Sequence, residues 1–105
     1  MRLSVAVLVP LLLSAASPAG AQKPARPQRL GLCAGCHGET GQAADRSVPN
    51  LAAQNLDYLR SALRQYRSGA RDVPAMRAVT AMLGDAELDA IVQWYAAQPA
   101  EAPAQ

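Results

Sequence analysis

The amino-acid sequence predicts an all-α domain built from three to five short helices. Apolar residues recur at spacings of three and four within residues 55–69 and again within residues 84–98, as on the buried face of a helix. No segment shows the apolar and polar alternation of a strand convincingly. The chain has 105 residues, which is enough for one domain only. Domains of this size bury a small fraction of their surface and often need an additional stabilising link, such as a disulfide or a bound metal.

The first 21 residues are expected to be a cleaved signal peptide. Arg2 precedes an apolar run over residues 3–16, and the small residues Ala19 and Ala21 fit a cleavage site before Gln22. A transmembrane anchor is the alternative, but this run is shorter than the roughly 20 residues that a spanning helix needs. Cleavage removes one of the ten basic residues and lowers the formal charge from +2 to +1. We therefore expect an exported protein with no membrane span after cleavage and no nucleic-acid partner.

The mature chain is expected to begin with a flexible lead-in over residues 22–27, which contains Pro24 and Pro27. Residues 28–98 then form the domain, and residues 99–105 form a disordered tail rich in alanine and proline. Pro27 suits the first turn of a short helix that continues through Leu30 and Leu32. Residues 38–54 lack helical periodicity and are expected to form a loop.

The clearest helix is predicted between Asn55 as its N-cap and Gly69 as its C-terminal cap. Its apolar stripe consists of Leu56, Leu59, Leu63 and Tyr66. The opposite face carries Arg60, Arg64 and Arg67, and Arg71 lies just beyond the helix; these four arginines form a basic stripe. This basic stripe is either the solvated face of an amphipathic helix or a surface that meets a partner or an acidic group of a cofactor.

A connecting segment over residues 71–83 precedes the last helix, which is expected to start at Gly84 or Asp85. The acidic residues of its first turns suit the positive end of the helix dipole. Its apolar stripe consists of Leu88, Ile91, Val92 and Tyr95, and we expect Trp94 and Tyr95 to pack near its end.

The pentapeptide from Cys33 to His37 contains both cysteines and the only histidine of the chain. Its Cys-x-x-Cys-His pattern indicates covalent attachment of one haem. Cys33 and Cys36 would add to the haem vinyl groups as thioethers, and His37 would become the proximal iron ligand. A redox dithiol would need a strand and helix pattern around it, and zinc would need a fourth ligand that the chain does not offer nearby.

The ligand on the other side of the iron is left open by the residues themselves. No second histidine exists, and Met1 is lost with the signal peptide, so Met76, Met82 or an open position remain. If residues 75–82 are helical, six positions rotate the two methionines about 240° apart. Only one of them can then reach the iron, and Met82 can be explained as core filling against the last helix.

From Leu32 to Gln98 the chain resembles the class I c-type cytochromes, most closely the small bacterial periplasmic type that also forms the halves of dihaem carriers. The resemblance implies a class I cytochrome c fold wrapped around one covalently attached haem. It also implies Met76 as the distal ligand, with Met82 as the fallback, and the backbone carbonyl of Pro49 as hydrogen-bond acceptor for His37. The residues that carry it are Cys33 to Gly38, Gly41, Val48 to Leu51, Gln54, Tyr58 and Leu59, Tyr66 to Arg71, Met76, and Leu83 to Asp85.

Two residues depart from the family pattern. Arg26 stands where a glycine usually precedes the first cysteine by seven positions, so the first helix is expected to be short. Gly84 replaces the serine that often caps the last helix, a change that costs only a few tenths of a kcal/mol.

The function expected from this resemblance is periplasmic one-electron transfer through a haem with His/Met axial ligation. No catalytic residue is expected, so the protein would not be an enzyme. Its partners would be redox protein donors and acceptors, membrane-bound or soluble, met as a monomer or in transient complexes. One alternative is a cytochrome subunit of a larger periplasmic oxidoreductase complex, and another is a gas or redox sensor with an open sixth position.

Overall fold

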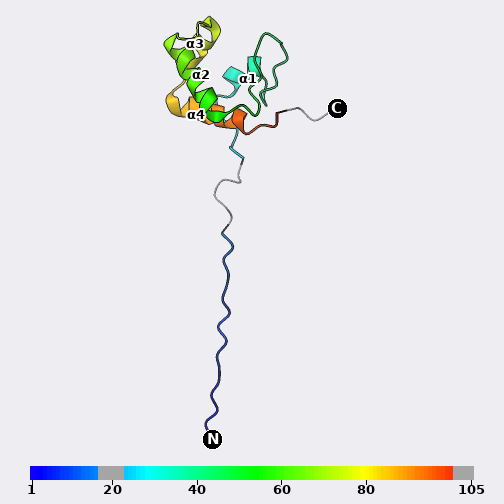
Figure 1. Cartoon of the computed structure of the whole chain (residues 1–105), viewed down its shortest axis with the longest axis vertical. Coiled ribbons are helices and arrows are strands. Elements are labelled where there is room, and N and C mark those ends of the chain that lie inside the picture. Colours follow the sequence, from blue (N-terminus) through cyan, green and yellow to red (C-terminus); the bar gives the residue numbers. More distant parts are fainter. Residues whose placement is uncertain (17–22, 101–105) are drawn as a thin grey trace.

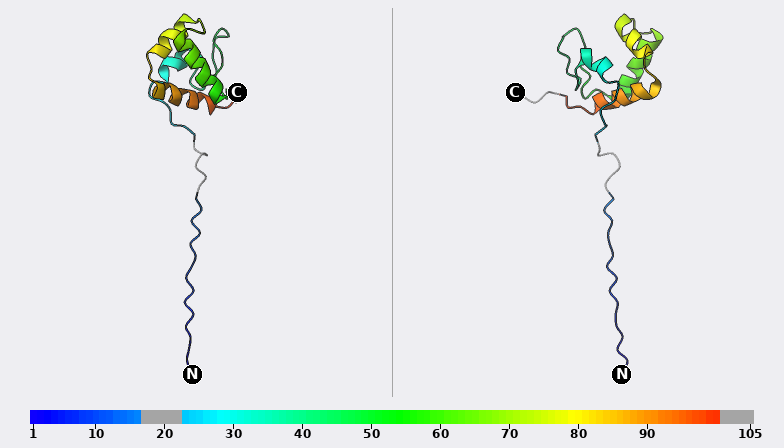
Figure 2. Two further views of the ribbon diagram at one scale, coloured as in Figure 1. Left: turned by 60° about the vertical axis from the view of Figure 1, so that its left-hand side comes forward. Right: turned by 180° about the vertical axis from the view of Figure 1, so that it is seen from behind.

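The computed structural model describes residues 1–16 and 23–100, and its four helices lie in the second range. They are α1 (Gly31–His37), α2 (Leu56–Ser68), α3 (Pro74–Ala81) and α4 (Asp85–Ala96). Because the described residues contain no strand, the predicted all-α fold is confirmed. Figure 1 shows α4 along the base of the domain, with α1 and the loop over residues 38–54 on one side and α2 and α3 on the other. The right-hand view of Figure 2 shows the same arrangement from behind.

Residues 1–16 have exposed side chains and no regular secondary structure. The expected cleavage position between Ala21 and Gln22 lies outside the described residues, as does the end of the expected tail from residue 101 onward. Across the two described ranges, no helix has both the length and the apolar character that crossing a membrane requires.

Helix α1 is shorter than the sequence suggested, since it begins at Gly31 and not at Pro27. The carbonyl of Pro27 accepts the N–H of Leu30 at 3.2 Å, which closes a turn before the helix. Leu30 is fully buried and anchors the start of α1 in the core. The lead-in before it makes contacts with the domain, because Pro24 lines a small groove beside α4 and the guanidinium of Arg26 forms an ion pair with Glu39.

Helix α2 has the two caps that the sequence predicted. The side-chain oxygen of Asn55 accepts the N–H of Tyr58 at 3.0 Å, which satisfies one of the free donors of the first turn. Gly69 ends the helix with φ of 84° and ψ of 3°, a left-handed conformation that glycine adopts without strain. Leu59 and Ala62 are the buried residues of its apolar face.

The expected connecting segment contains a helix, α3, which starts with Pro74 in its first turn, where a proline loses no helical hydrogen bond. Helix α4 follows after a short turn. Its N-cap Gly84 has no side chain to offer, but the carboxylate of Glu87 accepts the N–H of Gly84 at 3.1 Å, which preserves one half of a capping box.

The core lies where α4 meets α2 and the residue before α1. Its buried apolar members are Leu30, Leu59, Leu83, Leu88, Ile91, Val92 and Tyr95.

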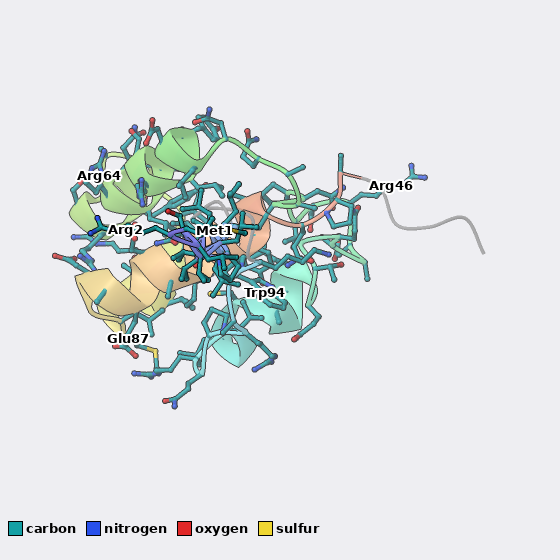
Figure 3. All side chains as sticks on the ribbon, turned by 90° about the horizontal axis from the view of Figure 1, so that it is seen from below. Met1, Arg2, Arg46, Arg64, Glu87 and Trp94 are labelled. Carbon is teal, nitrogen blue, oxygen red and sulfur yellow. The ribbon has the colours of Figure 1, made fainter. Side chains whose placement is uncertain are left out.

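Two arginines of the basic stripe cross from α2 to α4 beside this core. Arg60 donates to the carboxylate of Asp89 at 2.6 and 3.2 Å, and Arg67 forms an ion pair with Asp85. Arg64 is exposed on α2, where Figure 3 labels it. The stripe is therefore only partly a solvated face, because two of its four arginines join helices.

Candidate haem site

Helix α1 presents the two cysteines one turn apart, on neighbouring positions of the same helix face. Cys33 is half-buried, Cys36 is exposed, and neither is in a disulfide. Burial raises the pKa of the Cys33 thiol, and the nearby Cys36 adds to the rise. Reactive redox cysteines have a lowered pKa, so this environment does not favour the redox-dithiol alternative.

His37 is the last residue of α1 and only 7% of it is exposed. Its Nδ1 lies 2.9 Å from the carbonyl oxygen of Pro49. Because a carbonyl can only accept, this hydrogen bond assigns the proton to Nδ1 and leaves the lone pair of Nε2 free for a metal. A hydrogen bond from the ring nitrogen that does not bind the metal fixes the orientation and basicity of a ligating imidazole.

Two glycines allow the loop after His37 to fold back tightly. Gly38 and Gly41 have φ of 82° and 83°, in the left-handed region that disfavours other residues. A Cβ at Gly38 would lie 2.3 Å from the backbone oxygen of Gln42, and one at Gly41 would lie 2.5 Å from the backbone nitrogen of Ala52. The carbonyl of Gly41 accepts the N–H of Leu51 at 2.8 Å. These contacts close the loop and bring Pro49 to the imidazole.

The last turn of α4 holds the same loop through two aromatic side chains. The hydroxyl of Tyr95 donates to the carbonyl of Gly38 at 2.9 Å, and the indole N–H of Trp94 donates to the carbonyl of Glu39 at 2.8 Å. Figure 3 shows Trp94 on the side of the molecule where α1 lies. Burial is the main cause that raises the pKa of Tyr95, so its phenol remains a neutral donor.

The sequence indicated only packing for Trp94 and Tyr95, so these two hydrogen bonds were missed. The sequence did contain one signal for them. Tyrosine and tryptophan carry an O–H and an N–H that need acceptors when they are buried, and the glycine-rich loop offers backbone carbonyls.

The two candidate methionines occupy different environments at the other side of the domain. Met76 lies in the first turn of α3 and is half-buried, and the hydroxyl of Thr80 donates to its carbonyl at 2.8 Å. Met82 is the C-cap of α3 and is 56% exposed. The expectation that Met82 fills the core is wrong, because the adjacent Leu83, 5% exposed, takes the buried position.

The structure thus brings together Cys33, Cys36, His37 and Pro49, while Met76 comes from α3 on the opposite side in Figure 1. Two thiols one turn apart and an imidazole with a free Nε2 fit the covalent attachment and proximal ligation of a haem. A small helical domain with this site defines a c-type cytochrome.

Comparison with known proteins agrees with this class. The chain belongs to the family described as "Cytochrome C oxidase, cbb3-type, subunit III", which matches residues 28–94. It is 34% identical to cytochrome c-554(548) from Halomonas halodenitrificans over 67% of the chain and 88% of that protein. As a c-type cytochrome it carries covalently bound haem c and transfers electrons.

Longer proteins are similar over part of their length. The chain is 41% identical to a "Thiosulfate dehydrogenase electron acceptor" from Stutzerimonas stutzeri, over 65% of the chain and 32% of that protein. It is 29% identical to cytochrome c4 from Pseudomonas aeruginosa, over 92% of the chain and 48% of that protein. The chain therefore spans about a third and about half of these two relatives.

Proposed function

We propose that this protein is a periplasmic one-electron carrier whose haem iron is held between His37 and Met76, and that it is not itself an enzyme. The observation that carries the proposal is the hydrogen bond from Nδ1 of His37 to the carbonyl of Pro49 at 2.9 Å. It prepares the imidazole to bind iron through Nε2 and to remain bound in both oxidation states. When bound, the haem supplies a one-electron iron couple.

The chain's own residues have three tasks in this proposal. Cys33 and Cys36 hold the group covalently on α1, so that it cannot dissociate between encounters with partners. Met76 supplies a soft thioether from the other side, and His/Met ligation raises the reduction potential of a cytochrome. With His37 and Met76 both bound to the iron, the chain would leave no open position for oxygen or peroxide.

The partners proposed are redox proteins that donate and accept electrons at an exposed haem edge. One similar protein is named as an electron acceptor of thiosulfate dehydrogenase, which favours a dehydrogenase as the donor. The second candidate function, a cytochrome subunit of a larger oxidoreductase complex, is favoured by the same similarity. Co-elution of the native protein with a catalytic subunit during size exclusion would refute the free carrier.

The decisive experiment combines mass and absorption spectra of the mature protein with the variant Met76→Ala. We expect the mass to include one haem and the oxidised protein to show the far-red band of thioether-to-iron ligation. Met76→Ala should abolish this band, whereas the control Met82→Ala should retain it. A band that survives in Met76→Ala but not in Met82→Ala would transfer the ligand to Met82, and a protein without covalent haem would refute the whole proposal.

A further inference from the structure

The turn that joins α3 to α4 is held by arginines from two other parts of the chain. Nη2 of Arg67, at the end of α2, donates to the carbonyl of Leu83 at 2.7 Å. Nη1 of Arg29, in the turn before α1, donates to the carbonyl of Met82 at 3.4 Å. Carbonyls just beyond a helix end lack intrahelical partners, and cationic donors satisfy them well. Two adjacent carbonyls of the turn thus accept hydrogen bonds from arginines.

Arg67 holds the turn more firmly than Arg29 does, because its guanidinium has a second partner. Its Nη1 forms an ion pair with the carboxylate of Asp85, the first residue of α4. Asp85 is 91% exposed, so this ion pair contributes little by itself. Its effect is to orient the planar guanidinium toward the carbonyl of Leu83, a geometry that the single ammonium of a lysine cannot reproduce.

Hydrogen bonds within α3 connect the turn to Met76. The N–H of Met82 donates to the carbonyl of Val79 at 3.1 Å. Thr80 is 1% exposed and its hydroxyl donates to the carbonyl of Met76 at 2.8 Å. Helix α3 has only eight residues, so a shift of the turn moves Met76 with it.

We propose that Arg67 is a positioning residue that keeps α3 in place and thereby keeps the thioether of Met76 on the iron. The inference rests on the proposed ligation by Met76. Removing the contact of Arg67 with the turn lets the turn and α3 move away together, so the fraction of molecules with the thioether off the iron rises. An external ligand then binds more tightly in proportion to that fraction.

The test measures binding of imidazole to the oxidised haem-bearing protein, followed by the change in its absorption spectrum. For Arg67→Met we expect an apparent affinity about tenfold higher than in the wild type, the size of effect that loss of one charge-assisted hydrogen bond produces. The far-red band should weaken but persist. An affinity within about twofold of the wild type would overturn the inference.

The matched control is Arg60→Met. Arg60 and Arg67 are both 35% exposed and both join α2 to an aspartate of α4, but Arg60 does not reach the turn. Both variants should lower the urea midpoint of unfolding, whereas only Arg67→Met should change imidazole binding. Equal effects of the two variants on imidazole binding would show a merely structural role and overturn the inference.

A second variant keeps the test decisive if Arg67→Met does not accumulate with haem. Arg67→Lys retains the charge but cannot contact Leu83 and Asp85 in the same geometry. We therefore expect an affinity for imidazole between two and ten times that of the wild type. An affinity equal to the wild type would overturn the inference. The failure of the proposed function has a different signature, since the wild type would then lack the far-red band that Met76→Ala abolishes.

Discussion

The hydroxyl of Tyr95 ties the end of α4 to the residue after the proximal histidine, and Tyr95→Phe removes that single atom. The side chain is 1% exposed and its hydroxyl donates to the carbonyl of Gly38 at 2.9 Å. A buried acceptor that loses its donor costs about 1–3 kcal/mol. Because Gly38 is only half-buried, water reaches it in part. We therefore expect the free energy of unfolding to fall by about 1–2 kcal/mol.

Urea unfolding of the haem-bearing protein, followed by absorption and circular dichroism, measures this difference. The control Tyr58→Phe removes the same atom from a residue that is 48% exposed and whose hydroxyl makes only 3.5 Å contacts with Arg71. We expect the control to stay within about 0.5 kcal/mol of the wild type. The reasoning is refuted if Tyr95→Phe also stays within that margin, or if the two variants lose equal stability.

Three further changes test other parts of the fold by the same unfolding measurement. Gly41→Ala should cost more than about 2 kcal/mol, because a Cβ would lie 2.5 Å from a backbone nitrogen at a φ of 83°; a neutral result would show that the loop relaxes freely. Asn55→Ala should cost about 1 kcal/mol through loss of the N-cap of α2, and Asn55→Asp should restore most of it. Hydrogen bonds from Arg60 and then Gln93 lower the pKa of Asp89 below its ordinary value of 3.8. The stability from this pair is therefore complete at neutral pH and is lost as the pH falls below about 4. Asp89→Asn should reduce this acid-induced loss, and an unchanged pH profile would contradict the assignment.

The helix ends that depend on local chemistry could be predicted from the sequence. Asn55 and Gly69 bracket α2 because an N-cap and a left-handed glycine act on the residues next to them. Helix α3 was not predicted, since residues 71–83 were expected to form a connecting segment, although Pro74 suits the first turn of a helix. The start of α1 was placed too early at Pro27, where the chain forms a turn that brings Leu30 into the core.

The spacing of residues along the sequence could not predict contacts between segments that are far apart in the chain. The spacing of the arginines on α2 placed them on one face, but nothing local showed that Arg60 and Arg67 would meet aspartates 29 and 18 residues further on. For the site, the local pentapeptide placed Cys33, Cys36 and His37 together on one helix. The partner of His37 came only through resemblance to a family, since Pro49 lies twelve positions further on and is reached only when the loop folds back.

Helix α4 sets the distance between two groups of contacts in the domain. Asp85 and Asp89 in its first half bind the arginines of α2, while Trp94 and Tyr95 at its last turn hold the loop that follows His37. Ten positions along the helix separate Asp85 from Tyr95, about 15 Å at 1.5 Å per residue. One inserted residue would rotate one end against the other by about 100°. The helix can therefore accept many substitutions on its exposed face, but its length is constrained by the two sets of contacts that it separates.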